Sequence, residues 1–440
     1  MWLLPLVPAI ANAVLRVFYR FDVSGERVPR TGPLLLISNH PNMVGDPASV
    51  AAASRRPVRF LAKSPLFAHP LAGAALRSLG AIPVFRRKDD PSKVHLNDAM
   101  FEEVQRALGE GSAIGIFPEG ISHGGSSVAP LRTGAARIAL GAAQLTSDAV
   151  AIVPVGLVYG RKKEFRSKAT ALIGKPVDWI DLRDRGEQDQ DAVRELTARI
   201  DEALRSVTVN LEQWADAPAV RAAEAIYAAE LRLANDFGAK LDRIQGAARA
   251  LAAQRRSGDG EAETLVSELT EFSALLSELR LRPSDLDFRP KLRLVARWIV
   301  KRTLFLIVAI PVVMVGAVVF FVPYQLTRAL DRALRLDDVE RATAKILSGA
   351  ALYLLWISGL AIFAGLRFNA EVATACLLGL PATGIFTLWL AQRGVESWIQ
   401  ARRFLVLTVR RRLREGLLRR RRELFERLEE VRERLDGAQQ

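Results

Sequence analysis

The sequence has few of the side chains that build disulfide frameworks and metal sites. Its 440 residues include one cysteine, Cys376, and only four histidines. A single thiol excludes a disulfide framework and any zinc site built on cysteines. Four histidines leave little room for a histidine-rich metal site. We therefore expect no metal and no resident cofactor.

Charge is absent from three long apolar stretches, although 25% of all residues are charged. Residues 304–322, 346–366 and 372–391 lack Asp, Glu, Lys and Arg, and each stretch is long enough to cross a bilayer. The chain is 50% hydrophobic, with a mean hydropathy of +0.12. These values exclude a disordered chain and a simple polytopic membrane protein. They predict an integral membrane protein that joins a soluble part to membrane segments.

Basic residues around the apolar stretches leave their topology open. Loop 328–345 and the segment after residue 392 are basic, whereas connection 367–371 has only Arg367. The positive-inside rule places both ends of the last two stretches in the cytoplasm, together with the soluble domain that precedes them. The same rule places both ends of 304–322 in the cytoplasm, although a segment that crosses the membrane once must have its ends on opposite sides. A re-entrant or in-plane segment broken at proline resolves the conflict, and three true spans are the alternative.

The net charge of +14 points to a polyanionic partner. Its densest part is residues 402–422, where ten arginines stand against one glutamate. Basic residues next to membrane segments attract anionic lipids, so we expect anionic membrane lipids and no specific nucleic acid as partners. The alternative is a solvated run that acts only as a topology signal. The oligomeric state stays open.

The chain divides into regions of different composition. The first residues are apolar, but no Lys or Arg precedes Arg16, so a membrane-interface anchor is favoured over a signal peptide. We expect an anchor at 1–25, a catalytic domain at 26–182, a helical region at 183–290, a membrane domain of two to three apolar segments at 291–400, and a basic amphipathic C-terminal helix at 401–440.

Residues 31–180 read as an α/β domain. Short apolar runs of strand length are flanked by Gly and Pro, and helical patterns lie between them. Near-continuous apolar strands that alternate with helices predict a buried sheet covered by helices. The expected strands lie at 34–37, 58–61, 114–117 and 152–155.

The block Ser38–Pro47 follows the first of these strands and contains His40 and Asp46. A short loop can bring both side chains together, so that Asp46 holds one imidazole nitrogen and leaves the other free as a general base. The alternative is a turn with a solvent-facing histidine. The run Phe117–Ser122 also follows a strand, and its Glu119 is placed to grip hydroxyls or exposed backbone.

A third block, Gly80–Arg87, ends in two arginines after a short strand. The guanidinium fork matches phosphate oxygens, so Arg86 and Arg87 are candidate phosphate ligands. A solvated basic turn is the alternative. A fourth block, Val153–Leu157, is a strand whose small residues suit an acyl pocket or plain core.

Together, in this order, these four blocks resemble the PlsC superfamily of glycerolipid acyltransferases over residues 30–180. The chain departs from the common pattern in one respect, because five residues rather than four separate His40 from Asp46. A branch that includes fungal-type glycerol-3-phosphate and dihydroxyacetone-phosphate acyltransferases is similar in this spacing and in the pair Ser122-His123. The resemblance implies a PlsC-type α/β sheet, followed in this branch by apolar segments.

The resemblance also implies roles for individual residues. His40 takes the proton of the acceptor hydroxyl, and Asp46 stabilises the imidazolium that forms. Substrate-binding roles follow for residues in the remaining motifs: Arg86 and Arg87 for the phosphate, Glu119 and Gly120 for the acceptor, and Asn39, Lys63, Ser122 and Arg132 as further candidates. His123 is expected to be structural, and His69 and His95 to be surface or capping residues.

The expected activity is transfer of a fatty acyl group from acyl-CoA or acyl-ACP to glycerol 3-phosphate in phospholipid biosynthesis. Lysophosphatidate (1-acylglycerol 3-phosphate) is the alternative acceptor, and dihydroxyacetone phosphate also stays open. A non-catalytic membrane-remodelling or scaffold protein is the alternative of another class. The acyl thioester is a co-substrate, and the implied reaction needs neither a metal nor a covalent enzyme intermediate.

Overall fold

The computed structural model describes residues 3–43, 45–86, 90–162, 164–233, 236–256, 260–287, 292–333 and 338–437. The chain forms two compact units. The sheet unit comprises residues 1–214, 236–242 and 337–343, and the helical unit comprises residues 215–235, 243–336 and 344–440.

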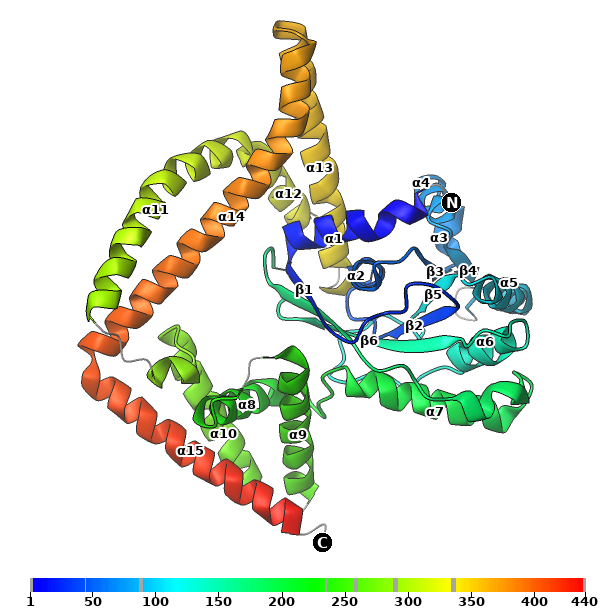
Figure 1. Ribbon diagram of the computed structural model, residues 1–440, viewed down its shortest axis with the longest axis horizontal. Helices are drawn as coiled ribbons and strands as arrows, with labels where there is room; N and C mark the ends of the chain where they lie inside the picture. The colour runs from blue at the N-terminus through cyan, green and yellow to red at the C-terminus, as the bar shows by residue number, and fades with distance from the viewer. Residues whose placement is uncertain are drawn as a thin grey trace. The chain divides into compact units, whose positions relative to one another are not determined.

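A seven-stranded sheet organises the sheet unit (Figure 1). The strand order is β1-β7-β6-β2-β5-β3-β4. Neighbouring strands run parallel except for the antiparallel pair β6 and β7. Their bounds are β1 Arg20–Gly25, β2 Leu34–Ser38, β3 Val58–Lys63, β4 Ile82–Val84, β5 Ala113–Ile116, β6 Ala151–Tyr159 and β7 Lys168–Ile173.

Helices cover both faces of this sheet, as the sequence predicts. The helices α5 (Asn97–Gly109), α6 (Gly134–Ala143) and α7 (Gln190–Ser206) pack on one face, and α1 (Val7–Phe18) and α2 (Gly45–Ser54) lie on the other. Two short helices, α3 (Pro65–Ala68) and α4 (Pro70–Ser78), follow β3.

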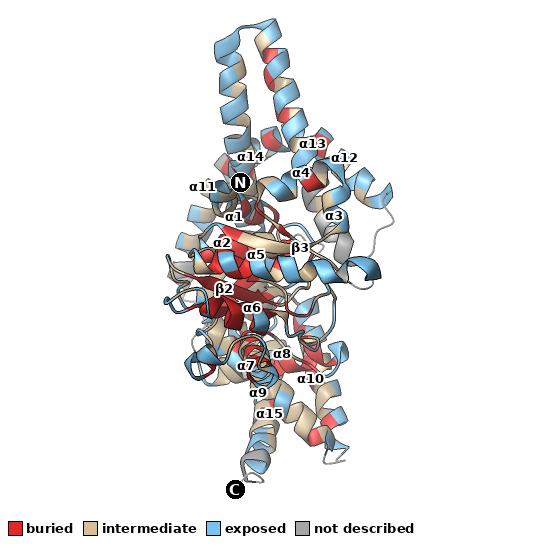
Figure 2. Ribbon diagram, turned by 90° about the vertical axis from the view of Figure 1, so that its right-hand side faces the viewer, coloured by how far each residue is buried: buried red, intermediate tan, exposed pale blue. Residues whose placement is uncertain are grey.

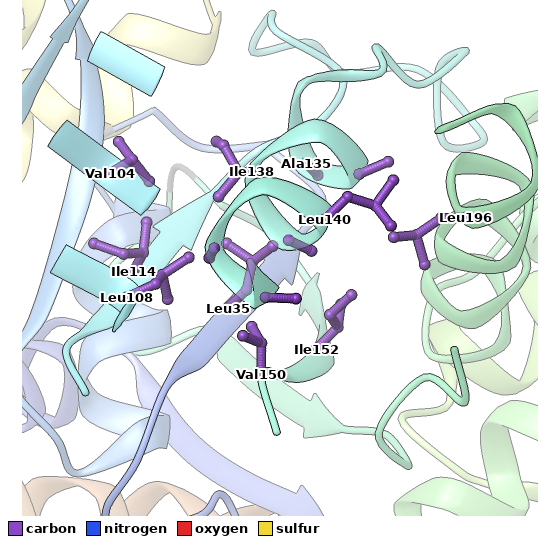
Figure 3. Packing of buried hydrophobic residues seen from close by; sticks show 14 of the residues in the cluster. Leu35, Val104, Leu108, Ile114, Ala135, Ile138, Leu140, Val150, Ile152 and Leu196 are labelled. Carbon is purple, nitrogen blue, oxygen red and sulfur yellow. The ribbon is translucent and has the colours of Figure 1, made fainter. Parts of the chain in front are cut away.

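The main core lies between the sheet and the first of these helical layers. Leu35 and Ile114 from the strands meet Leu108, Ile138 and Leu140 from the helices, and all five are fully buried (Figure 3). Figure 2 shows the same region as the buried centre of the sheet unit. This close-packed apolar core fixes the strand ends from which the site is built.

Two boundaries differ from the sequence-based expectation. Residues 20–25, which we assigned to the membrane-interface segment, form β1 and pair in parallel with β7. Helix α7, which we assigned to the helical region at 183–290, belongs to the sheet unit, because Val193, Leu196 and Ile200 lie in the main core.

The helical unit contains a small bundle. Helices α8 (Ala217–Glu230), α10 (Glu261–Glu278) and α15 (Arg411–Gly437) share one hydrophobic cluster, and α9 (Phe237–Arg256) lies between α8 and α10 in sequence. Part of the arginine-rich segment packs inside this bundle. Arg421 is buried and its guanidinium pairs with Glu230 and Asp287 at 2.7 and 2.8 Å. The segment is therefore not simply a solvated run.

Four helices hold the apolar stretches: α11 (Leu292–Val319), α12 (Phe321–Ala333), α13 (Asp338–Arg367) and α14 (Ala370–Val409). Three helical segments among the described residues are long and apolar enough to cross a membrane: Arg297–Val319, Ser348–Arg367 and Ala370–Arg403. Few of the residues in these segments are buried (Figure 2). Helix α11 continues through Pro311 and ends near Phe320 instead.

Candidate active site

The candidate site lies at one edge of the sheet, where the parallel strands β6, β2, β5, β3 and β4 have their carboxyl ends. His40 follows β2, and Glu119 follows β5. Lys63 ends β3, and Arg86 follows β4. Residues that the sequence separates widely therefore meet at the edge where open α/β sheets commonly bind ligands.

His40 and Asp46 form the expected pair. The His40 Nδ1 and Asp46 Oδ2 atoms are 2.9 Å apart. Asp46 is fully buried in the first turn of α2, whereas 20% of the His40 side chain is exposed. Because an ionised carboxylate only accepts hydrogen bonds, Nδ1 carries the proton, which leaves the Nε2 lone pair free. The described residues give Nε2 no hydrogen-bond partner.

Three donors converge on Asp46. Its Oδ2 also accepts a hydrogen bond from the backbone N–H of Asn42 at 2.6 Å, and its Oδ1 accepts one from the Tyr159 hydroxyl at 2.8 Å. Burial raises the pKa of Asp46, and the hydrogen bonds from His40, Asn42 and Tyr159 oppose that rise. These donors therefore support the charged carboxylate that the histidine needs.

Two tyrosines complete this network, and sequence reasoning missed both. Burial raises the pKa of Tyr159 well above its usual value and that of Tyr19 to about 12, so both phenols stay protonated donors at neutral pH. The Tyr19 hydroxyl accepts from Asn42 Nδ2 at 3.1 Å and donates to the Lys162 carbonyl at 2.6 Å. Tyr19 thus fixes the loop that carries His40.

The imidazole of His40 lies against an aromatic ring. Its ring stacks on Phe117, with centroids 4.1 Å apart and an interplanar angle of 14°. Phe117 in turn stacks near Phe60 at 6.1 Å. Gly115 makes room for this arrangement, because a Cβ atom there would overlap the Phe60 ring. The stack holds the imidazole plane and leaves its Nε2 edge free.

Glu119 holds the backbone of the histidine loop. Its Oε1 accepts the His40 N–H at 3.0 Å. Its Oε2 accepts the Ala129 N–H at 2.8 Å and the Nε2–H of His123. The Gly125 N–H donates to His123 Nδ1 at 2.9 Å, which assigns the proton to Nε2. With its side chain 1% exposed, Glu119 is placed to position His40 rather than to contact an acceptor.

Ser122 and Asn39 also bind backbone. The Ser122 hydroxyl donates to the His40 carbonyl at 2.8 Å. Asn39 bridges to Leu157 of β6, accepting from its N–H at 2.7 Å and donating to its carbonyl at 3.0 Å. These contacts give both residues positioning roles, unlike the substrate-binding roles expected for them.

Gly120 has a φ of +70° and lies under Arg132, whose Nε would be 2.6 Å from a Cβ atom at that position. A side chain there would be both strained and crowded. Gly120 therefore lets the exposed Arg132 side chain lie close to the Glu119 turn.

The remaining candidates differ in their surroundings. Lys63 and Arg86 are half-buried at the ends of β3 and β4, and Arg87 lies outside the described residues. His69 caps α4, because its Nδ1 accepts the Ala72 N–H at 3.3 Å, and His95 is exposed. No three His, Cys, Asp or Glu side chains gather as metal ligands within the described part of the chain.

Similarity to known proteins covers the same segment as this site. The sequence model of the family described as Acyltransferase matches residues 20–158. Glycerol-3-phosphate O-acyltransferases 1 and 2 of Saccharomyces cerevisiae are 34% and 37% identical over 29% and 30% of this chain. The matched region spans only 18% of the length of each yeast protein.

Two bacterial proteins are also similar. The 1-acyl-sn-glycerol-3-phosphate acyltransferase of Bacillus subtilis is 27% identical over 36% of this chain and 71% of its own length. The crystal structure of the 1-acyl-sn-glycerophosphate acyltransferase PlsC from Thermotoga maritima matches with a TM-score of 0.35 and 20% identity. That match covers 47% of this chain and 78% of the other. On the family match, the chain carries a PlsC-type acyltransferase domain over residues 20–158.

Proposed function

We propose that the chain transfers a fatty acyl group from acyl-CoA or acyl-ACP to a hydroxyl of glycerol 3-phosphate. The observation that carries this proposal is the His40–Asp46 pair, in which a buried carboxylate holds Nδ1 and Nε2 stays free. Nε2 takes the proton of the acceptor hydroxyl while its oxygen attacks the thioester carbonyl. The tetrahedral intermediate then collapses, and the thiolate leaves with the proton from the imidazolium.

The basic side chains at the site edge support a phosphorylated acceptor. Neighbouring strands lie about 4.8 Å apart, so Lys63 on β3 starts about 10 Å from the β2 end that carries His40. Long Lys and Arg side chains close much of that gap. Lys63, Arg86 and the exposed Arg132 would hold a phosphate on one side of His40, within the reach of a glycerol phosphate.

Glycerol 3-phosphate is the first choice among acceptors because the two yeast relatives carry that substrate in their names. Lysophosphatidate is the second choice, since relatives from Brassica napus and Bacillus subtilis are named as 1-acyl-sn-glycerol-3-phosphate acyltransferases. We propose that no metal takes part, and that the catalytic domain works on the cytoplasmic face, where acyl-CoA and acyl-ACP are available.

An acceptor panel tests the proposal. Membranes that contain the chain are given glycerol 3-phosphate, dihydroxyacetone phosphate or lysophosphatidate, each with acyl-CoA and with acyl-ACP. We expect labelled lysophosphatidate from glycerol 3-phosphate, absent from membranes that carry the Asp46→Asn variant. Transfer to lysophosphatidate alone would show that lysophosphatidate, and not glycerol 3-phosphate, is the acceptor. The proposed role of the His40–Asp46 pair would be unchanged. No transfer to any acceptor would favour a non-catalytic membrane-remodelling or scaffold role.

A further inference from the structure

Helices on either side of the apolar segments pack against each other. In the helical unit, Ala219 of α8 and Leu269 of α10 share a buried cluster with Leu424 of α15. Arg421 of α15 also pairs with Glu230 of α8 at 2.7 Å. Because these side chains touch, the chain enters and leaves the membrane on the same side. It must cross an even number of times between α10 and α15, so three apolar helices cannot all cross.

Helices α13 and α14 form a hairpin long enough to cross and return. They are joined at Phe368 and Asn369. The two helices lie close together beside this turn, because a Cβ atom added at Gly365 would be only 3.2 Å from the Cβ atom of Ala373. From Lys345 to Arg367, α13 measures about 33 Å at 1.5 Å per residue, against a hydrocarbon thickness of about 30 Å.

Helix α11 starts its apolar part level with the base of this hairpin. Arg302 Nη2 donates to the Arg393 carbonyl of α14 at 2.8 Å. The two guanidiniums also lie over aromatic rings, Arg302 over Phe305 at 5.2 Å and Arg393 over Trp389 at 4.4 Å. Basic and aromatic side chains of this kind mark a membrane–water interface.

Helix α11 ends about a third to two fifths of the way from the base of the hairpin to its turn. The Val319 carbonyl accepts a hydrogen bond from Trp356 Nε1 of α13 at 3.0 Å, and Phe320 stacks with Tyr353 at 5.8 Å. A Cβ atom at Gly384 of α14 would lie 3.1 Å from the Phe320 ring. Tyr353 is about 12 Å along α13 from Lys345, and Gly384 about 14 Å along α14 from Arg393.

Both measures place the end of α11 near the middle of the bilayer. Between Arg302 and Phe320, α11 is about 27 Å long. Its end lies only about 14 Å from the base of the hairpin, so α11 must run obliquely to the bilayer normal. A full crossing would bring its end close to the hairpin turn, and the contacts of Phe320 lie about 21 Å short of that turn.

Helix α12 then returns to the starting level. A Cβ atom at Gly349 of α13 would lie 3.6 Å from the Thr327 methyl group. Farther along α12, Asp331 Oδ2 pairs with Lys345 Nζ at 3.2 Å. Lys345 stands at the base of α13, so the C-terminal end of α12 is back at the membrane surface. In Figures 1 and 2, α12 lies beside the lower part of α13.

We propose that the chain crosses the membrane twice, by α13 and α14, and that α11 and α12 form a re-entrant helical hairpin that reaches the middle of the bilayer from one side. No described helix between β1 and α11 is long and apolar enough to cross, so the acyltransferase domain lies on that side too. This topology places every strongly basic flank on one side, which removes the conflict with the positive-inside rule.

The lone Cys376 makes the topology testable by thiol labelling. In a Cys376→Ala background, four exposed positions receive a cysteine one at a time: Glu202→Cys in α7, Arg332→Cys at the end of α12, Glu371→Cys at the hairpin turn, and Glu433→Cys in α15. Each full-length variant is treated with a membrane-impermeant maleimide in sealed vesicles of known orientation, and then in detergent.

We expect positions 202, 332 and 433 to react in one vesicle orientation and position 371 in the opposite one. Three true spans would instead pair 202 with 371 and place 332 and 433 on the far side. Reaction of all four positions in one orientation would mean that nothing crosses. Either of these outcomes overturns the proposal, and reaction in detergent shows that each thiol is reactive.

The depth of the turn is a second measurement. A fluorophore on Phe320→Cys should be quenched most strongly by lipids brominated near the middle of the acyl chain, and a fluorophore on Arg332→Cys by lipids labelled near the headgroup. Shallow quenching at both positions would show that α11 lies in the plane of the interface and would contradict re-entry.

Discussion

Replacing Glu119 by Gln tests whether this carboxylate positions His40 or binds the acceptor. Glu119 is buried and accepts hydrogen bonds from the His40 N–H, the Ala129 N–H and His123. A glutamine keeps the size but replaces one acceptor oxygen by a donor, so its NH₂ group must face an N–H group. Hydrogen bonds to a charged group contribute about 1.5–3 kcal/mol, and an unsatisfied buried donor costs about 1–3 kcal/mol.

The structure therefore predicts that Glu119→Gln lowers the free energy of unfolding by about 2–4 kcal/mol. For a unit of this size, that corresponds to a fall of roughly 5–15 °C in the midpoint of thermal unfolding. The turnover number should fall with it, because the His40 loop loses its anchor, while the KM for the acceptor changes little. Thermal unfolding in detergent and steady-state acyl transfer measure both effects.

Glu103→Gln is the matched control. Glu103 is 48% exposed and pairs with Arg59 at 2.6 Å, and such surface pairs contribute about 1 kcal/mol or less. We expect little change in its unfolding midpoint or activity. An unchanged midpoint for Glu119→Gln with a strongly raised KM for the acceptor would refute the positioning role and restore direct acceptor binding.

Two further substitutions probe the Asp46 network and the helical bundle. Tyr159→Phe removes a donor to Asp46, whose pKa burial already raises, so the charged carboxylate is lost at a higher pH. The acidic limb of the pH–rate profile should therefore move to higher pH, and a lower rate with an unmoved profile would contradict this. Arg421→Met leaves Glu230, whose side chain is 18% exposed, without its partner and should cost about 2–3 kcal/mol of stability, less than the loss of one partner of a fully buried pair. Arg422→Ala changes an exposed position and should cost almost nothing; equal effects of the two substitutions would show that the Arg421–Glu230 pair does not stabilise the bundle.

The sequence predicts the strands in the middle of the sheet well, and the two strands at one side, β1 and β7, poorly. Strands such as β2 are continuous apolar runs because both faces are buried. Strand β1 reads Arg-Phe-Asp-Val-Ser-Gly and lies at the edge of the sheet, so its signal is weak beside the apolar helix that precedes it. Strand β7 begins Lys-Ala-Thr-Ala, and its small side chains give little contrast with a loop.

The contacts of the site are also predicted to different degrees: local contacts are visible in the sequence, and long-range contacts are not. The His40–Asp46 pair joins residues six positions apart, so a local motif predicts it. Tyr159 reaches Asp46 across 113 positions, and only the pairing of β2 with β6 reveals that contact. Polar residues in a motif can face substrate or backbone, and the sequence does not distinguish the two. Glu119 and Asn39 face backbone, which requires the folded loops to be seen.

The central claim is that His40 acts as the base in acyl transfer to a phosphorylated glycerol. The most direct test compares wild-type and His40→Ala chains, at equal amounts in membranes, for transfer of a labelled acyl group to glycerol 3-phosphate. Loss of a general base lowers the rate by about 10²–10⁴-fold, and we predict a loss in that range with an unchanged unfolding midpoint. Wild-type activity in the properly folded His40→Ala chain would contradict the account.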